Sequence, residues 1–317
     1  MDQKLDTSRP FTRAQALRAG VSAKALRGPG FRRILRGVFV AASATVDRDE
    51  RIAAALLVCG DDAFATHASA ARLLALPIPV VAEEHVSVRR ATQRRRRRED
   101  LVCHVDLDSD VQLVEGLRCA SPLDTFGQLA SLIGLVDLVV VGDHLVRHQR
   151  TTPERLVTFC AGFRGPGAAL ARRAASYVRK DVDSPMETRL RMLLVLAGVP
   201  EPRINHTVRE VDGQPLRRYD LSWPDVRVIV EYDGRHHVER IEQWAADLPR
   251  REGIDNDRWR IIVVVSRGIY QEPAQTIERV FRVLRERRLP GLPARPADGW
   301  RPHFPGHDGL GGGRKAG

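Results

Sequence analysis

The sequence has few of the features that mark secreted proteins, membrane proteins or cysteine-based metal proteins. Its four cysteines, spread over 317 residues, form no CxxC pair and no Cys/His cluster, so they indicate free thiols in a reducing cytoplasm. The longest apolar runs, near residues 53–59 and 135–141, are too short to span a bilayer, and the N-terminus lacks the apolar segment of a secretory signal. We therefore expect a soluble cytoplasmic protein without a membrane partner.

Lysine is also scarce, although the chain is strongly basic. Lysine and arginine together number 51 against 40 acidic residues, and the formal net charge is +11, yet only four of the basic residues are lysines. The arginine guanidinium is a planar fork of donors that suits phosphate, so this composition favours a nucleic-acid partner. A genome rich in G and C, which encodes arginine wherever a cation is tolerated, explains the composition equally well.

Residues 12–40 have the order of a small winged helix-turn-helix. Thr12 can cap a helix with Gln15 three residues later, and Gly20 ends that helix. Ser22 can cap a second short helix, and the segment "RRILRGVFV" then predicts two strands joined by a basic turn. Helix, turn, helix and basic wing is the order of many DNA-binding domains. The candidate DNA contacts are Lys24, Arg27, Arg32, Arg33 and Arg36.

Composition and pattern divide the chain into five segments. They are a DNA-binding region (1–45), a mixed α/β scaffold (46–163), a linker and helix (164–183), an α/β domain (184–288) and a Pro/Gly-rich tail (289–317) that we expect to be disordered. Within the scaffold, His67 stands where a helix would begin, and we interpret it as a capping or packing residue. Five arginines at 94–98 predict a solvated loop that would add nonspecific affinity beside DNA.

In the α/β domain we expect, in order along the chain, a helix, two strands, a helix or loop, a third strand and a final helix. Its first helix begins at Ser184, with Pro185 at the first position and Glu187 three residues beyond the cap. Glu187 is therefore fully explained as the acid of a capping box. A role as metal ligand is the alternative, and the pattern leaves it open.

Two strands of this domain carry acids. "LRRYDLSW" and "VRVIVEYDG" flank a Pro-Asp turn signal at 224–225, so we expect them to pair antiparallel. A turn centred there would place Asp220 opposite Ile229 and diagonal to Glu231, and Asp233 shares the face of Glu231. Diagonal carboxylates, roughly 7–8 Å apart, can converge on a hard cation such as Mg²⁺.

Burying several acids together is costly unless a cation neutralises them. Either a metal does so, or nearby arginines form a structural network with the acids; the candidate arginines are Arg217, Arg218 and Arg235. We favour the metal because His236 and His237 closely follow Asp233. A neutral imidazole at the edge of such a site could act as general base on water.

The order of "SPMETRLRMLLVLAG", "YDLSWPDVRVIVEYDGRHH" and "DLPRREGIDNDRWRIIVVV" resembles a family of bacterial domains related to the very-short-patch-repair (Vsr-like) endonucleases of the PD-(D/E)XK superfamily. This resemblance covers about residues 184–288. The segments "FTRAQALRAGVSAKALR", "RRILRGVFV" and "THASAARLLAL" are similar to the winged-helix and scaffold region of AbiEi-like antitoxins of type IV toxin-antitoxin systems.

The resemblance to the nucleases implies a role for each matching residue. The implied metal ligands are Asp220, Glu231 and Glu187. His237 matches a catalytic histidine of Vsr-like relatives, and Arg251 matches a position suited to a phosphate contact. Asp233 replaces the lysine that the superfamily usually has two residues after its second acid, and Vsr-like members also lack this lysine. His237 must therefore help to activate water.

These observations predict an α/β (α+β) multidomain protein. It would have an N-terminal winged helix-turn-helix with a mixed α/β scaffold, and a C-terminal restriction-endonuclease-like α/β domain with a mixed central sheet. The favoured function is a DNA endonuclease that needs Mg²⁺ or Mn²⁺. One alternative is a DNA-binding transcriptional regulator, antitoxin-like, whose nuclease fold is catalytically inactive. Another is an RNA-processing enzyme, because the same metal site could cut either polymer. A homodimer, the form of the DNA target and the pathway are left open.

Overall fold

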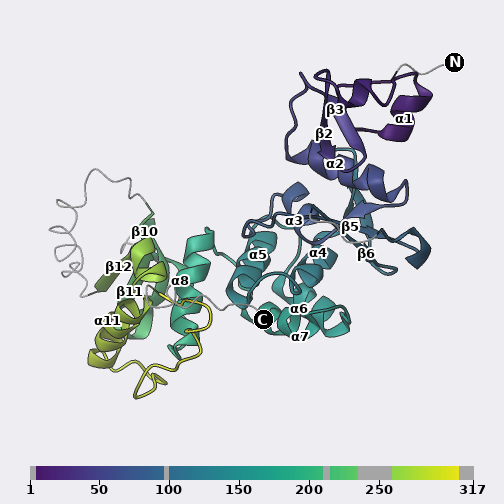
Figure 1. Cartoon of the computed structure of the whole chain (residues 1–317). Helices are drawn as coiled ribbons and strands as arrows, with labels where there is room; N and C mark the ends of the chain where they lie inside the picture. The colour runs from purple at the N-terminus through teal and green to yellow at the C-terminus, as the bar shows by residue number, and fades with distance from the viewer. Residues whose placement is uncertain (1–4, 96–99, 210–214, 235–258, 307–317) are drawn as a thin grey trace, which may run out of the picture. The chain divides into compact units, whose positions relative to one another are not determined.

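A computed structural model describes residues 5–95, 100–209, 215–234 and 259–306 (Figure 1). The chain forms two units: one comprises Met1–Ile133 and Glu154–Ala175, and the other comprises Gly134–Pro153 and Ser176–Gly317. Helices occur together with mixed or antiparallel sheets, which confirms the predicted α/β multidomain class.

The N-terminal part of the first unit is a three-stranded sheet of order β1-β3-β2. Its elements are β1 (Phe11–Thr12), α1 (Arg13–Arg18), η1 (Ala25–Arg27), β2 (Phe31–Leu35) and β3 (Val38–Ala41). The predicted capping box is present: Gln15 N–H donates to Thr12 Oγ1 at 3.2 Å, and Thr12 N–H donates to Gln15 Oε1 at 2.7 Å. Phe11 is buried at the centre, its ring 5.7 Å from that of Phe31.

The second helix of this region is shorter than predicted, because η1 is a single turn of 3-10 helix. Ser22 Oγ accepts from the N–H of Ala25, the first residue of η1, at 3.1 Å, although the residue in the N-cap position is Lys24 and not Ser22. The helix stops at Gly28, which has an extended ψ of 176°. Pro29 explains this stop, since a residue that precedes proline is driven out of the helical region. The order of elements thus agrees with the prediction, and the length of the second helix does not.

The rest of the first unit contains a five-stranded mixed sheet of order β6-β5-β4-β8-β7. Its elements are α2 (Arg48–Cys59), β4 (Phe64–Ala65), α3 (His67–Leu73), β5 (Glu84–Val88), η2 (Ala91–Gln93), β6 (Leu101–Val105), β7 (Val111–Val114), β8 (Leu117–Ala120), α4 (Pro122–Leu129), α6 (Pro153–Gly162) and α7 (Ala168–Tyr177). Strands β5 and β6 pair in parallel. An apolar cluster that includes Ala55, Val86 and Leu101 packs α2 against them.

The second unit is built on a four-stranded sheet of order β12-β11-β10-β9. Its elements are α5 (Leu135–Arg147), α8 (Pro185–Leu196), β9 (Arg203–Arg209), β10 (Pro215–Trp223), η3 (Pro224–Val226), β11 (Val228–Tyr232), β12 (Arg260–Val264), α10 (Ser266–Tyr270) and α11 (Pro273–Glu286). β10 is antiparallel to β9 and β11, and β12 is parallel to β11, so the sheet is mixed. Helices α8 and α11 contact each other and both pack on β11 (Figure 1).

Two elements of this unit differ from the sequence prediction. Helix α5, predicted as part of the 46–163 scaffold, packs against α8 and joins it through an ion pair between Asp143 and Arg191. An apolar run predicts that a helix is buried, but it does not identify the element that the helix packs against. Strand β9 was not predicted, because "RINHTVR" mixes polar and apolar residues without a clear alternation.

The prediction of a disordered tail is wrong for residues 289–306. Trp300 and Phe304 are buried, with 5% and 3% of their surface exposed. The backbone of this segment is held as well, since Ala297 N–H donates to the carbonyl of Ala197 at 2.8 Å. Proline and glycine leave the tail with few apolar side chains, but two aromatic ones supply enough buried area to fix its course. Residues 307–317 lie outside the described part.

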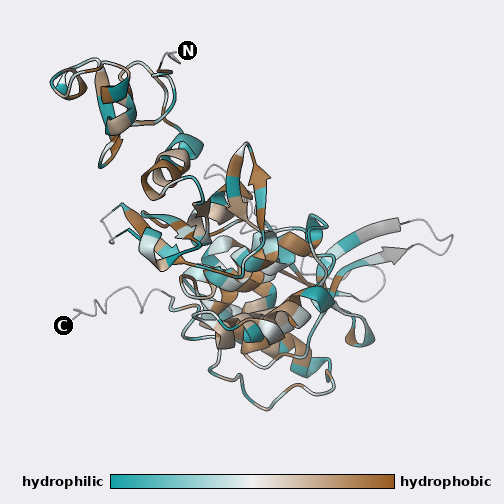
Figure 2. Cartoon of the chain, turned by 90° about the vertical axis from the view of Figure 1, so that its right-hand side faces the viewer, coloured by the Kyte–Doolittle hydropathy of each residue, from teal (hydrophilic) through white to brown (hydrophobic). Residues whose placement is uncertain are grey.

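Helices of both units mix hydrophilic and hydrophobic residues, coloured teal and brown in Figure 2. Among the residues that the structure describes, no helix is long and apolar enough to cross a membrane.

Candidate functional site

The acids of the second unit come together beside the hairpin of β10 and β11. The turn is longer than predicted, because η3 is followed by Arg227 in the left-handed conformation (φ 55°). Leu221 consequently pairs with Val230, and the same register, continued by one residue, sets Asp220 beside Glu231. The predicted diagonal placement is wrong by two residues. Directly opposed residues have Cβ atoms about 4.5–5.5 Å apart, so the two acids are closer than expected.

Asp220 is a half-buried carboxylate in an unfavourable electrostatic environment. Burial raises its pKa to about 7, and the nearby carboxylates of Glu187 and Glu231 act in the same direction. The backbone N–H of Tyr232 opposes this effect by donating to Asp220 Oδ2 at 2.8 Å. Near neutral pH, a proton or a cation is therefore favoured at this carboxylate.

Glu187 reaches the same place from the first turn of α8. Ser184 caps the helix as predicted, its Oγ accepting from Glu187 N–H at 3.2 Å. The carboxylate of Glu187 does not return to the Ser184 N–H as a capping box requires. It accepts instead from the backbone N–H of Asp183 at 3.0 Å and from Asn205 Nδ2 at 3.3 Å. The side chain is 8% exposed, so a second acid is buried beside Asp220.

The alternative of an arginine network is only partly supported. Arg218 pairs with Asp183 at 2.9 Å, at the edge of the acidic group. Within the described residues, no arginine or lysine forms an ion pair with Asp220. The side chain of Arg217, and Arg235 as a whole, lie outside the described part. Arg218 thus neutralises the neighbouring Asp183, but none of the described arginines or lysines neutralises Asp220.

Other predicted site residues are only partly covered by the structure. Asp233 directly follows β11, and its backbone N–H donates to the carbonyl of Val264 at 2.9 Å. His237 and Arg251 lie outside the described residues. In the part of the chain that is described, the acids do not assemble into a group of three metal-ligand atoms.

The predicted DNA contacts form an exposed basic surface on residues 5–45. This segment has eight basic side chains and a single acid, Asp6. All five candidate contacts are exposed: Lys24, Arg27, Arg32, Arg33 and Arg36. Arg36 lies in the β2–β3 turn beside Gly37, whose φ of 91° favours glycine, and Arg32 and Arg33 lie on β2. The structure therefore brings the predicted cations to the surface of one small fold.

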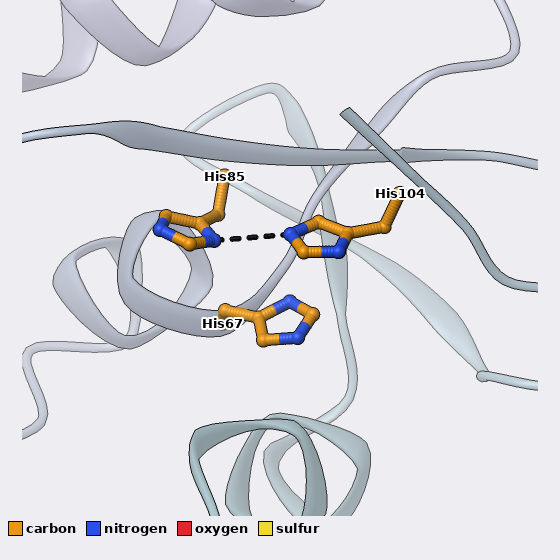
Figure 3. A group of neighbouring side chains, drawn as sticks. All are labelled: His67, His85 and His104. Atoms are coloured by element: carbon orange, nitrogen blue, oxygen red, sulfur yellow. Dashed lines mark hydrogen bonds between the residues drawn. The ribbon is translucent and has the colours of Figure 1, made fainter. Parts of the chain in front are cut away.

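Sequence reasoning missed a second cluster, in the first unit. His67, His85 and His104 lie together, with one candidate ligand atom of each within 4.8 Å of the other two (Figure 3). His67 begins α3 as predicted and packs against the other two rings. The three residues are far apart in sequence and follow no known ligand spacing. The pairing of β5 with β6 brings His85 and His104 together, and the pairing of β4 with β5 sets the start of α3, and so His67, beside them.

Comparison with known proteins places no family name on this chain. No family model matches the sequence. The uncharacterized proteins MT2308 and Rv2248 of Mycobacterium tuberculosis are each 24% identical to it over 199 residues, which is 62% of this chain and 73% of each relative. The crystal structure of the Rv2827c protein from the same organism covers 64% of this chain and 84% of its own at 16% identity, with a TM-score of 0.35.

Proposed function

We propose that the protein is a metal-dependent DNA endonuclease, in which the second unit hydrolyses a phosphodiester bond and residues 5–45 hold DNA. The observation that carries this proposal is Asp220, a half-buried carboxylate beside Glu187 and Glu231 that has no ion pair with arginine or lysine in the described residues. An ionised carboxylate in such a place destabilises the fold unless it binds a proton or a cation. The resemblance to Vsr-like endonucleases assigns the same three acids to metal binding.

The chemistry of these donors fits Mg²⁺ or Mn²⁺. Carboxylate oxygens are the ligands that both ions prefer, and Mg²⁺ usually needs only one or two of them besides water. A bound ion would stabilise charge on the phosphate and lower the pKa of the attacking water. Asp220 and Glu231 would hold the ion, with Glu187 as a third carboxylate, and the Tyr232 N–H would orient Asp220. His237 would take the proton from water.

The basic surface of residues 5–45 would bind the phosphate backbone of DNA. Phosphate contacts of this kind supply affinity that depends on salt and little on sequence. A cytoplasmic location and a homodimer stay predictions of this proposal.

The test is cleavage of supercoiled plasmid and of end-labelled single-stranded DNA, with Mg²⁺, Mn²⁺ or EDTA. Asp220→Asn and Glu231→Gln keep the shape of each side chain and remove its charge. Each should lower the cleavage rate about 100-fold or more, because a catalytic metal contributes several kcal/mol to the transition state. Asp225→Asn is the matched control: this acid is exposed in η3 of the same hairpin, and its loss should leave cleavage unchanged.

A second candidate is a DNA-binding transcriptional regulator of the antitoxin type, with an inactive nuclease fold. It is favoured by the absence of a three-acid metal group among the described residues, while the basic surface on residues 5–45 is exposed. A regulator would select a defined sequence from a random DNA library. It would bind equally well with Asp220→Asn and poorly with Arg32→Ala and Arg33→Ala combined. Wild-type protein that binds DNA and cleaves no substrate with either metal would overturn the nuclease in favour of this candidate.

A further inference from the structure

The three histidines of the first unit come from separate elements and meet on one side of the five-stranded sheet. The parallel register pairs His85 of β5 with Val102, and His104 of β6 with Ser87. Residues two apart on a strand face the same side, so His85 and His104 project from one face of the sheet. His67, the first residue of α3, lies next to both: its ring centre is 4.1 Å from that of His104 and 5.4 Å from that of His85.

Local structure fixes the backbone of His67 at this position. Its φ of 49° lies in the left-handed region, which is uncommon for a residue other than glycine. Its N–H donates to Gln128 Oε1 at 2.9 Å, and Gln128 Nε2 donates in turn to Asp106 Oδ2 at 2.9 Å. A polar chain of three residues therefore holds the start of α3 against the sheet.

One ring nitrogen of His67 faces the other two histidines. His85 Nδ1 and His104 Nε2 are 3.0 Å apart, and Figure 3 shows a nitrogen of His67 turned toward this pair. His67 Nδ1 is buried and has no hydrogen-bond partner among the described residues, and the whole residue is 8% exposed. A buried polar atom without a partner is destabilising. A ligand placed between the three rings would remove that cost.

The surroundings of His67 are unfavourable for a charged ring. Burial lowers the pKa of His67 to about 2, and the neighbouring imidazoles of His104 and His85 act in the same direction. Neutral imidazole is the form that binds transition metals.

The cluster borders an open pocket of about 900 Å³, whose lining includes His67, His104, Asp106 and Gln128. A small molecule or water can thus reach the histidines from one side. Structural zinc sites have four protein ligands and are closed. Catalytic zinc sites have three protein ligands and an open position, and the second arrangement matches this cluster.

We propose that His67, His85 and His104 bind one divalent transition-metal ion, Zn²⁺ above all, with a fourth position open to the pocket. Imidazole suits zinc and its neighbours in the first transition row, whereas Mg²⁺ prefers oxygen ligands. This site is therefore chemically distinct from the carboxylate site of the second unit and does not depend on it.

Small movements suffice to form the site. Nitrogens bound to one tetrahedral zinc ion lie about 3.4 Å apart, given Zn–N distances of roughly 2.0–2.1 Å. His85 and His104 would separate slightly from 3.0 Å, and His67 would move closer to them. The ion takes the place of the hydrogen between His85 and His104. That proton moves to the other nitrogen of the same ring, so every imidazole stays neutral.

The experiment uses the full chain without an affinity tag, stripped of metal and then titrated with Co²⁺, whose visible absorption reports tetrahedral coordination. The absorption of tetrahedral Co²⁺ in the wild type should saturate at one equivalent, and Zn²⁺ should then displace that ion. His104→Asn, a variant of similar size at a half-buried position, should weaken binding at least about 100-fold, because even indirect partners of a metal ligand contribute 10–100-fold. Circular dichroism establishes that each variant is folded.

Two further variants sharpen the test. His104→Cys replaces one zinc ligand by another, so it should retain Co²⁺ and add a sulfur-to-metal absorption band. His148→Ala is the matched control: His148 is exposed and its ring lies 4.2 Å from that of His144 on α5, the arrangement of an ordinary surface metal site. Absence of stoichiometric Co²⁺ in the folded wild type, or binding lost with His148→Ala and kept with His104→Asn, would overturn the proposal in favour of a metal-free imidazole stack.

Discussion

The ion pair between Arg191 of α8 and Asp143 of α5 gives the sharpest test of how the second unit is built. Arg191 is 0% exposed, and its guanidinium donates to Asp143 Oδ2 at 2.8 Å and to Glu201 Oε1 at 3.0 Å. Asp143 also accepts from the backbone N–H of Arg179 at 2.8 Å and from Thr188 Oγ1 at 2.9 Å. The contact thus fastens α5, which lies outside the predicted 184–288 domain, to the first helix of that domain.

Arg191→Met keeps much of the aliphatic volume and removes the charge. Asp143 is then left buried with two neutral donors, and removing one partner of a buried pair costs about 3–5 kcal/mol. Typical domains are stable by only about 5–15 kcal/mol, so this is a large share of the total. Arg189→Met is the matched control: Arg189 pairs with Asp137 across the same two helices at 2.6 Å, but the side chains are 19% and 25% exposed. Because both side chains keep contact with water, this pair should contribute less than the fully buried one, nearer the roughly 1 kcal/mol of exposed pairs.

Urea unfolding followed by tryptophan fluorescence measures the free energy of unfolding of the second unit, to which Arg191 belongs. All four tryptophans belong to the second unit, so their emission does not report on the first. A loss below about 1 kcal/mol for Arg191→Met, or equal losses for Arg191→Met and Arg189→Met, would refute the reasoning. Adding Asp143→Val to Arg191→Met should recover part of the stability, because the uncompensated charge is then gone.

Three further predictions follow from the described contacts. Trp300→Ala should lower the free energy of unfolding of the second unit by about 3–5 kcal/mol in the same urea assay, and no change would mean that the 289–306 segment does not stabilise the fold. Burial first, and then the electrostatic effect of the nearby His148, Arg150 and Arg147 side chains, lowers the pKa of His144 to about 4. The unfolded chain, with a histidine pKa near 6.5, then binds the extra proton, so stability should fall as pH drops from about 6.5 toward 4; thermal melts of His144→Asn should show a smaller decline. Removing the charge of Arg33 should reduce the slope of log affinity for DNA against log salt by about 0.9, whereas Arg118→Ala, on β8 of the same unit, should leave the slope unchanged.

Capping residues predicted where a helix begins, whereas the sequence predicted less well which other elements each helix or strand packs against or pairs with. The Thr12 and Gln15 capping box and the Ser184 cap are present, because each depends on residues three positions apart. The length of the β10–β11 turn was wrong, because Pro224 and Asp225 mark a turn without fixing how many residues it contains. The prediction that α5 belongs to the 46–163 scaffold was wrong for a related reason, because an apolar helix face can pack against many different partners.

The same distinction decides which candidate sites a sequence reveals. Asp220 and Glu231 lie on adjacent strands joined by a short turn, so an error of two residues in the register still left them as neighbours. His67, His85 and His104 are separated by 18 and 19 residues, and no local spacing connects them. His85 and His104 meet because β5 and β6 pair in parallel, and parallel strands need a crossover whose register the chain does not encode locally. His67 joins them because β4, which precedes α3, pairs with β5. A histidine cluster whose members come from two parallel strands and a helix is therefore hidden from pattern reasoning, although each histidine is plain in the sequence.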